Sequence, residues 1–310
     1  MKLPGNSSEV MVGILNWNQK EDTLKCLDSL RRVEDPALHI VLVDNGSSDG
    51  SVAAVKSDYP EVVILANHTN RGCAGGRNDL LKYFLATKLP YLIFLDNDAM
   101  VRPDTIARLV QEIKASPDIG VLGLRAYYDD RPNVFWSRGG ACLDPGTGKF
   151  TGLGQKEEDR GQYACMEEVD SVPGGFTFLK REVAEKVPVM DERYFIYYED
   201  SDWCMRVKKA GFRIFTSANA SVSHRVSASL GMESPRFYYY RTRNRFLFMR
   251  ENAPEHFRLF SKYFFYSELP RRMRTLFLSR QYRQMWGCLL GVYDFWKGSW
   301  YVCGRKSLGA

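Results

Sequence analysis

Short apolar runs alternate with amphipathic stretches through the first 125 residues, and this alternation restricts the folds open to the chain. Segments 21–32 and 103–113 carry apolar residues at helical spacing, and the second opens on a proline, as the first turns of helices often do. The strand-like runs are VMVGILNW (10–17), LHIVLVD (38–44), VVILA (62–66), YLIFLD (91–96) and IGVLGL (119–124). Strand and helix in repetition predict an α/β fold, with a mostly parallel sheet flanked by helices on both faces.

The pattern changes after residue 125. The glycine-rich stretch GGACLDPGTGKFTGLGQ (139–155) predicts a less regular, partly antiparallel region at one edge of the sheet. Residues 197–211 predict a helix and FRIFT (212–216) one last strand, and aromatic, basic helices are expected beyond Pro235. We therefore expect three parts: two halves of one domain over 1–235, divided as 10–125 and 126–235, and a helical segment over 236–310.

The cysteines and the distribution of apolar residues indicate the cellular compartment of the protein. The seven cysteines are odd in number and none form C-x-x-C, so neither a zinc site nor a disulfide framework is indicated. The start of the chain lacks a basic stretch followed by a sustained apolar run, and no later window is long and apolar enough for a membrane span. These features predict a cytoplasmic protein that is soluble or lies on a membrane surface.

Polar side chains follow three of the predicted strands, at the edge where an α/β sheet binds its ligands. They are Asn16 after the first strand, Asp44 after the second, and Asp96, Asn97 and Asp98 after the fourth. Two aspartates one residue apart repel each other unless positive charge lies between them, and paired carboxylates suit a hard divalent ion such as Mg²⁺ or Mn²⁺. Such an ion would bind a diphosphate. The alternative is a solvated turn whose acids cap the next helix.

Two common nucleotide sites do not fit this sequence. A dinucleotide site needs G-x-G-x-x-G directly after the first strand, and a P-loop needs G-x-x-x-x-G-K-[ST]. Here the first strand is followed by NWNQKEDT (16–23), which contains no glycine. Hydride transfer and ATP hydrolysis therefore lose their main support.

Seven stretches, in order over about residues 10–250, together resemble the family 2 glycosyltransferases with the GT-A fold, and bacterial rhamnosyltransferase-like members most closely. They are VGILNWNQKEDTLKCLDSL (12–30), VDNGSSDGS (43–51), NHTNRGCAGGRN (67–78), FLDNDAMVRPD (94–104), VDSVPGGFTFLKREV (169–183), MDERYFIYYEDSDWCMRVKKAGFRIF (190–215) and RNRFLF (243–248). An ordered set of this kind is far more specific than any single motif. The resemblance implies a nucleotide-sugar-binding half over 10–125 and an acceptor half over 126–235.

The resemblance also implies roles for individual residues. Asp44 would hydrogen-bond the pyrimidine base, Asp96 would face the ribose, and Asp98 would bind the metal together with Asp96 and His224. The implied nucleotide-binding set is Asn16, Asp44, Arg71, Gly75, Gly76, Asn78, Asp96 and Asn97. Two alternatives stay open: the glycines also suit a plain loop-to-helix turn, and a lone histidine such as His224 is often structural.

A second acidic cluster, YYEDSDW (197–203), opens the predicted helix. Acids are common at helix N-termini because the helix dipole favours them. In the family this Glu-Asp pair supplies the catalytic base, and the resemblance points to Asp200, with Glu199 as the second choice. A single base that accepts the proton of a sugar hydroxyl implies one displacement with inversion.

We thus expect an inverting, metal-dependent glycosyltransferase of cell-surface polysaccharide biosynthesis. The resemblance favours dTDP-L-rhamnose as the donor, with UDP-sugars next, and a saccharide or polyprenyl-diphosphate-linked acceptor. One alternative is a sugar-1-phosphate nucleotidyltransferase, which should carry a glycine-rich, arginine-containing loop after its first strand. Another is a protein that binds a nucleotide sugar without catalysis.

The basic character of the chain is concentrated at its C-terminal end. Residues 236–310 hold fifteen Lys and Arg against four Asp and Glu, whereas residues 1–235 hold 28 against 33. Aromatic and basic helices of this kind suit peripheral contact with an anionic membrane, on the inner face of the plasma membrane. They equally suit packing on the catalytic domain or on a second subunit in a homodimer. No nucleic-acid-binding motif is present, so we expect no nucleic acid partner.

Overall fold

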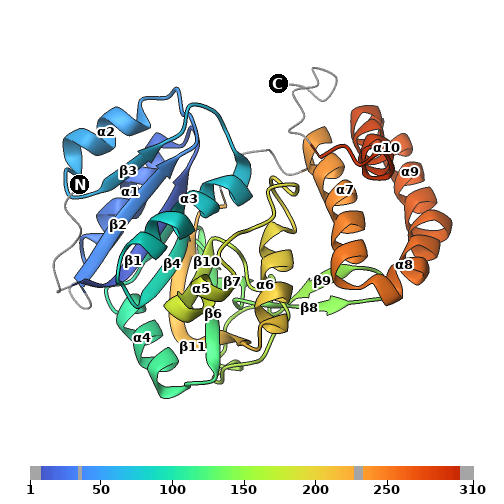
Figure 1. Cartoon of the computed structure of the whole chain (residues 1–310). Helices are drawn as coiled ribbons and strands as arrows, with labels where there is room; N and C mark the ends of the chain where they lie inside the picture. The colour runs from blue at the N-terminus through green and yellow to red at the C-terminus, as the bar shows by residue number, and fades with distance from the viewer. Residues whose placement is uncertain (1–7, 34–36, 227–232, 301–310) are drawn as a thin grey trace.

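A mixed α/β unit and a group of helices make up the molecule, as the computed structural model shows (Figure 1). It describes residues 8–33, 37–226 and 233–300. The strands are β1 Ser8–Asn16, β2 Ala37–Asp44, β3 Val63–Ala66, β4 Tyr91–Asp96, β5 Ala99–Val101, β6 Ile119–Tyr128, β7 Arg131–Ser137, β8 Ala141–Asp144, β9 Lys149–Gly152, β10 Phe176–Lys180 and β11 Arg213–His224. The helices of the α/β unit are α1 Lys20–Leu30, α2 Ser51–Asp58, α3 Gly72–Ala86, α4 Thr105–Ala115, α5 Arg181–Lys186 and α6 Glu199–Lys209.

The large sheet has the strand order β3-β2-β1-β4-β10-β6-β11-β5, with β7 paired to β6. The first four strands of this order are parallel, and Asn16 and Asp44 lie opposite each other where β1 and β2 end. Strand β10 then runs antiparallel to both β4 and β6, and β5 runs antiparallel to β11. The predicted α/β class is therefore confirmed, with a parallel half followed by a mixed half.

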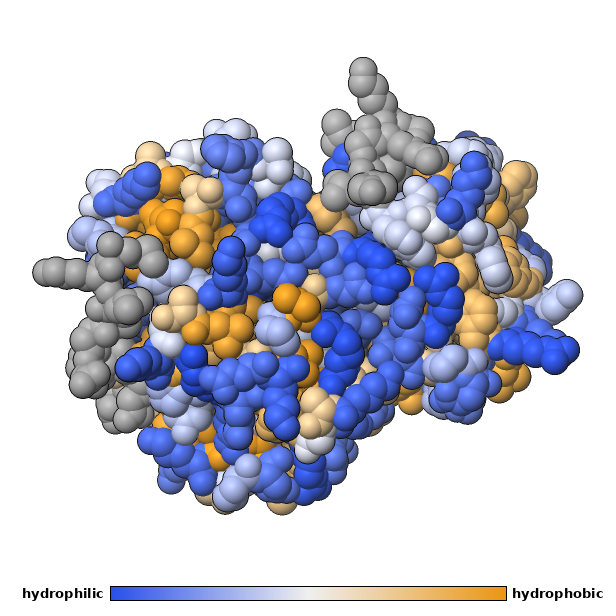
Figure 2. Space-filling model, viewed as in Figure 1, coloured by the Kyte–Doolittle hydropathy of each residue, from blue (hydrophilic) through white to orange (hydrophobic). Residues whose placement is uncertain are grey.

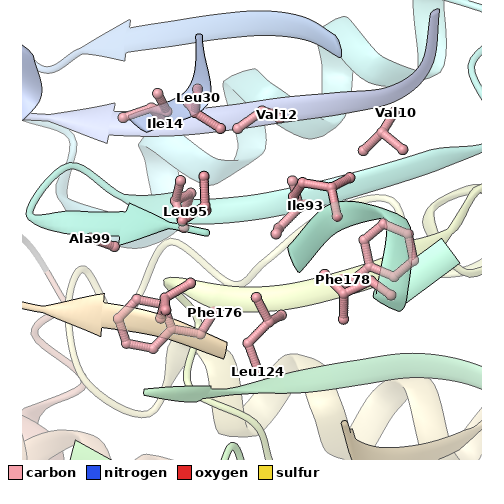
Figure 3. Close-up of a cluster of buried hydrophobic side chains, with 14 of the residues drawn as sticks. Val10, Val12, Ile14, Leu30, Ile93, Leu95, Ala99, Leu124, Phe176 and Phe178 are labelled. Atoms are coloured by element: carbon pink, nitrogen blue, oxygen red, sulfur yellow. The ribbon is translucent and has the colours of Figure 1, made fainter. Parts of the chain in front are cut away.

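Both faces of the sheet are buried, which explains why its strands read as almost continuous apolar runs. Along β1, Val10, Val12 and Ile14 point into one core, whose packing against β4 and β10 is drawn in Figure 3. Met11, between them, points into the core on the other face, which includes Trp203 of α6. The alternation of successive side chains along a strand thus places helices on both faces.

The predicted elements differ from the observed ones in two places that matter for the site. The strand predicted over 212–216 continues as β11 to His224, because it pairs along β6 and then with β5. Strand β5 itself, Ala99–Val101, was not predicted. Its pairing sets His224 opposite Ala99, one residue after Asp98. The glycine-rich stretch forms the antiparallel hairpin β8–β9.

After Pro235 the described chain is helical, as predicted. The elements are α7 Pro235–Asn252, η1 Pro254–His256, α8 Phe257–Tyr263, η2 Phe264–Glu268, α9 Leu269–Leu278 and α10 Tyr282–Lys297. Helix α10 packs closely on α7, because a Cβ at Gly287 would lie 2.3 Å from the carbonyl oxygen of Pro235. Among the described residues, no helix is long and apolar enough to cross a membrane. The division of the chain into domains stays a prediction.

Candidate active site

A cavity of about 430 Å³ opens at the carboxyl ends of β1, β2 and β4. Its lining brings together segments that are distant in sequence: the turn after β4, the start of α6, the end of β11 and the loop before α6. The predicted site residues that it contains are Asp96, Asn97, Asp98, Glu199, Asp200 and His224. A cavity at this edge is where an α/β sheet of this kind binds ligands.

Asp96, Asp98 and His224 form a candidate metal site on one side of the cavity. Each offers one ligand atom, and these atoms lie within 4.8 Å of one another. His224 Nε2 is 3.2 Å from Asp98 Oδ1, and its buried Nδ1 has no hydrogen-bond partner within the described parts of the chain. The imidazole ring is fixed edge-on against Trp136 and Phe176, at centroid distances of 4.6 and 4.9 Å. Two carboxylates and an imidazole fit a divalent cation such as Mn²⁺ or Mg²⁺.

Two glycines before β10 make room for this side of the site. A Cβ at Gly175 would lie 1.9 Å from Asp96 Cγ, and one at Gly174 would lie 2.3 Å from Arg77 Nη1. Any larger residue would therefore move the carboxylate or the guanidinium. The burial of Asp96 raises the pKa of its carboxyl, an effect that Arg77 opposes and Asp98 reinforces.

Arg77, a buried cation of α3 that was not among the predicted site residues, links the two acidic clusters. Its Nη1 donates to Glu199 Oε1 at 2.8 Å, and its Nη2 is 3.5 Å from Asp96 Oδ1. Burial opposes protonation of the guanidinium, but the surrounding acids outweigh it and raise the pKa of Arg77 above its usual value. Arg77 lies one helical turn after Cys73, which also lines the cavity, but only the packing of α3 shows that this face of the helix meets the site.

Glu199 and Asp200 are adjacent in sequence but sit in different environments. Glu199 is 3% exposed and pairs with Arg77. Burial and the neighbouring Asp200 raise the pKa of Glu199 to about 8, although Arg77 opposes that shift. Asp200 is less buried and accepts hydrogen bonds from the backbone N–H groups of Gly174, at 3.1 Å, and Ser201, at 2.7 Å. Asp200 is thus the carboxylate that is more open to the cavity.

The loop that delivers this pair to the cavity is strained. Phe195, Tyr197 and Tyr198 have φ angles of 63°, 65° and 72°, a region that bulky residues rarely occupy. The side-chain amide of Asn244, buried in α7, lies within hydrogen-bond distance of three carbonyl oxygens of this loop, at 2.7 to 2.8 Å. Strained backbone of this kind persists only where surrounding contacts hold it, and helix α7 supplies them here.

Asn16, Asp44 and Asn97 form a buried polar network beneath the cavity. Asn16 Nδ2 donates to Asp44 Oδ1 at 2.8 Å, and Asn97 Nδ2 donates to Asn16 Oδ1 at 2.9 Å. Asn16 is fully buried and Asp44 is 2% exposed, and only Asn97 belongs to the lining. These residues hold the ends of three strands together, and their nucleotide contacts stay a prediction.

The remaining predicted nucleotide residues, all on or beside α3, do not line this cavity. Arg71 pairs with Asp79 and Glu192, and Asn78 Nδ2 donates to the carbonyl oxygen of Met190 at 3.0 Å. Gly75 and Gly76 allow close packing instead: a Cβ there would lie 2.7 Å from Arg71 Cβ and 2.3 Å from Leu15 Cδ1. In the structure Arg71 and Asn78 form polar contacts and the two glycines allow close packing, and the nucleotide role of all four stays a prediction.

Comparison with known proteins decides the family. Residues 11–188, more than half of the chain, match the model of glycosyl transferase family 2. The chain belongs to this family. It is therefore a glycosyltransferase, and the resemblance stated from the sequence is confirmed. A dTDP-rhamnosyl transferase RfbF of Shigella flexneri is 24% identical over 79% of this chain and 81% of its own length. An N-acetylglucosaminyl-diphospho-decaprenol L-rhamnosyltransferase of Mycobacterium tuberculosis is 27% identical over 67% of this chain and 73% of its own.

Solved structures show the same fold for the family 2 chain. A mannosyltransferase from Pyrobaculum calidifontis, in complex with GDP-Man and Mn²⁺, is 16% identical, with a TM-score of 0.58 over 95% of this chain and 88% of that one. Residues 1–349 of S. aureus TarS, in complex with UDP-GlcNAc, are 15% identical, with a TM-score of 0.59 over 93% and 80% of the two chains. The GT-A prediction of the fold is confirmed by these likenesses.

Proposed function

We propose that this glycosyltransferase moves a sugar from a nucleoside diphosphate donor to a hydroxyl of a saccharide or polyprenyl-diphosphate-linked acceptor, with inversion and with Mg²⁺ or Mn²⁺. One observation carries the proposal. The three candidate metal ligands and the partly open carboxylate of Asp200 line the same cavity, although they come from three separate stretches of the chain.

The metal would be held by Asp96, Asp98 and His224. When bound, a divalent cation supplies positive charge that stabilises the diphosphate. The donor set and the buried, unpartnered His224 Nδ1 support this part of the proposal. The structural neighbour that contains Mn²⁺ and GDP-Man supports it at the level of the fold.

Asp200 is the general base of the proposal. A sugar hydroxyl is a poor nucleophile, and a carboxylate that accepts its proton as the new bond forms lowers the barrier. Hydrogen bonds from the backbone N–H groups of Gly174 and Ser201 orient the carboxylate of Asp200. Glu199 is less suited, because it is buried and paired with Arg77. Instead, Glu199 and Arg77 hold the start of α6 against α3.

The donor is proposed to be dTDP-L-rhamnose, with UDP-sugars next. Two relatives named as rhamnosyltransferases, which cover two thirds or more of the chain, support this choice. The rival nucleotidyltransferase would need a glycine-rich loop after β1, and residues 16–23 contain no glycine. A binding protein without catalysis would need no base at Asp200. Such a protein would not hydrolyse the donor, whereas a transferase would hydrolyse it slowly.

The test is turnover of dTDP-L-rhamnose by the purified protein with Mg²⁺ or Mn²⁺, measured as donor hydrolysis and as transfer to acceptors. We expect Asp200→Asn to lower turnover by roughly 10²- to 10⁴-fold, the range for loss of a general base. Asp98→Asn should lower it as strongly and weaken the metal response. The control is Asp104→Asn, which alters an exposed pair with Arg108. Wild-type turnover in the Asp200 variant would show that this role is wrong.

We also propose that the outer face of α8–α10 lies on an anionic membrane at the inner face of the plasma membrane. Of the ten large hydrophobic side chains exposed among the described residues, nine belong to this segment. Apolar side chains, in orange, are exposed among polar ones on the helical part of the molecule, at the right of Figure 2. On α10 they recur at alternating spacings of four and three, so they form one stripe: Tyr282, Trp286, Leu289, Tyr293 and Trp296. The opposite side of α10 is buried against α7.

Charge favours a lipid surface over a second copy of the chain as the partner of this face. Residues 257–300 contain eight Arg and Lys, whereas their two acids, Glu268 and Asp294, are each only 3% exposed. Two such faces would repel each other in a homodimer, but anionic headgroups would attract them while Trp and Tyr enter the interface.

Flotation with vesicles tests the membrane contact. We expect wild-type protein to float with phosphatidylglycerol vesicles and much less with phosphatidylcholine vesicles. Trp286→Ser combined with Tyr293→Ser should abolish flotation and leave donor hydrolysis unchanged. If the double variant instead converts a dimer to a monomer in light scattering, the face joins two copies and the membrane proposal is wrong.

A further inference from the structure

A second cavity, of about 440 Å³, lies next to the candidate active site, between β9, α7 and α9. Five of its lining residues are cations: Lys149, Arg241, Arg245, Arg271 and Arg272. Glu268 is the one acid of the lining. The walls of the cavity therefore carry a surplus of four positive charges.

Glu268 is already saturated by three of these cations. Arg245 donates to both of its oxygens, at 2.8 and 3.0 Å, and Arg272 Nη2 and Lys149 Nζ lie 2.6 and 3.0 Å from it. Glu268 and Arg245 are 3% and 5% exposed, so this cluster is shielded from water on its inner side. One carboxylate cannot neutralise three cations: Glu268 balances the buried Arg245, and the side chains of Arg272 and Lys149, 27% and 44% exposed, leave two positive charges at the wall of the cavity uncompensated.

The other two cations are available for a ligand. Arg241 and Arg271 are exposed, and within the described parts of the chain neither has a carboxylate within ion-pair distance. Arg241 lies over the ring of Phe237, at 5.0 Å, which restricts its guanidinium without neutralising it. Arginine presents several N–H donors in a fixed plane and therefore suits phosphate oxygens.

The basic cavity adjoins the active-site cavity directly. Tyr198 and Arg241 line both. On β9, Phe150 lines the active-site cavity and its neighbour Lys149 lines the basic one, so successive side chains of one strand face the two spaces. Asp200 is two residues after Tyr198. A group bound in the basic cavity is therefore near the proposed base, and none of the candidate metal ligands lines this cavity.

We propose that the basic cavity binds a phosphate or diphosphate group carried by the acceptor, so that the acceptor hydroxyl enters the active-site cavity beside Asp200. This inference rests on the proposed transferase function. The two anions of the reaction are then bound by different means: a diphosphate of the donor at the acidic rim with a metal, and the acceptor's anion by the arginines of the chain itself.

The test measures binding in the absence of divalent metal, with EDTA present, so that the donor site does not contribute. The probes are inorganic pyrophosphate and a short-chain prenyl diphosphate. Their binding is measured by calorimetry or as the rise in the Tm of the protein. We expect both to bind wild-type protein, the prenyl ester more tightly. Arg271→Gln should weaken binding of both about tenfold, as expected for the loss of one charge-assisted contact.

The controls separate this inference from the transferase proposal. Arg271 lines only the basic cavity, so Arg271→Gln should keep wild-type donor hydrolysis with metal. Arg258→Gln, an exposed arginine of α8 outside the lining, should bind both probes as wild type does. Arg241→Gln is a second variant, expected to weaken probe binding similarly.

Three results would overturn the inference while leaving the transferase function untouched. Equal probe affinity in wild type and Arg271→Gln would show that the cavity is not the site. Pyrophosphate binding as tightly as the prenyl ester would point to a free anion instead of an acceptor. Binding of phosphatidylglycerol vesicles, lost in Arg271→Gln, together with no binding of either soluble probe would point to a lipid headgroup. Absence of donor hydrolysis and of transfer in wild type, with probe binding that Arg271→Gln weakens, would instead contradict the transferase proposal and leave the cavity as an anion site without an acceptor role.

Discussion

The two neighbouring cavities have opposite electrostatic designs. In the active-site cavity, one buried cation, Arg77, contacts the carboxylates of Glu199 and Asp96, and further acids line the same space. In the basic cavity, one buried acid, Glu268, contacts Arg245, Lys149 and Arg272. Each central residue is thus outnumbered by charges of the opposite sign.

This contrast indicates what each cavity is for. Like charges that line one cavity repel each other, and a bound ligand of the opposite charge relieves that repulsion. The surplus therefore favours a ligand of the opposite sign, a divalent cation in one cavity and a phosphate group in the other. In our proposal the first ligand binds the donor and the second is part of the acceptor.

The largest expected effect is at Arg77, the buried cation of the active-site cavity. Arg77→Met should lower the free energy of unfolding by about 3 to 5 kcal/mol, because it leaves the buried carboxyl of Glu199 without its partner. Urea unfolding at neutral pH measures this loss. The matched control is Arg71→Met, six residues earlier, whose pairs with Asp79 and Glu192 are partly exposed and should matter by about 1 kcal/mol or less. Equal effects of the two substitutions would contradict the central role of Arg77.

Glu268, the buried acid of the basic cavity, should make the stability of the protein depend on pH. Burial alone would raise the pKa of Glu268, but hydrogen bonds from Arg245 and the other cations lower it to about 2, against 4.5 in the unfolded chain. Above pH 4.5 the ionised form stabilises the fold by about 3 kcal/mol, and this contribution is lost as the pH falls towards 2.

Urea unfolding of wild type and Glu268→Gln over a pH series measures this contribution. The variant should be less stable near neutral pH, and the difference between the two should narrow by about 3 kcal/mol as the pH falls towards 2. A difference that stays constant with pH would mean that Glu268 is not held in its ionised form by these cations.

The smallest expected change in stability concerns the close packing of the acidic side. Gly175→Ala should lower the free energy of unfolding by about 1 to 3 kcal/mol, because its Cβ would overlap Asp96. It should also weaken the activation by metal, since Asp96 must move. Gly152→Ala on β9 is the control, because a Cβ there meets nothing within 4 Å. Unchanged metal activation in Gly175→Ala would show that the position of Asp96 is not critical.

Much of the acidic site could be predicted from sequence, and almost none of the basic one. Asp96 and Asp98 follow a strongly apolar strand, so their place at the edge of the sheet follows from local patterning. The sequence pointed to Arg71 and not to Arg77. Which of these two arginines faces the cavity depends on how α3 packs against the loop at Phe195, and local sequence patterns do not show that packing. Helix α7 was predicted, but its hold on that strained loop through Asn244 was not.

The sequence alone determined the α/β class, the end of each central strand and the family, because these depend on periodicities of a few residues and on ordered local stretches. The tertiary structure decided which charges meet. Arg77 and Glu199 are 122 residues apart in sequence, and Glu268 is joined to Lys149 across more than a hundred residues. Electrostatic pairing depends on distance in space, so only the folded chain separates one cavity with surplus negative charge from another with surplus positive charge.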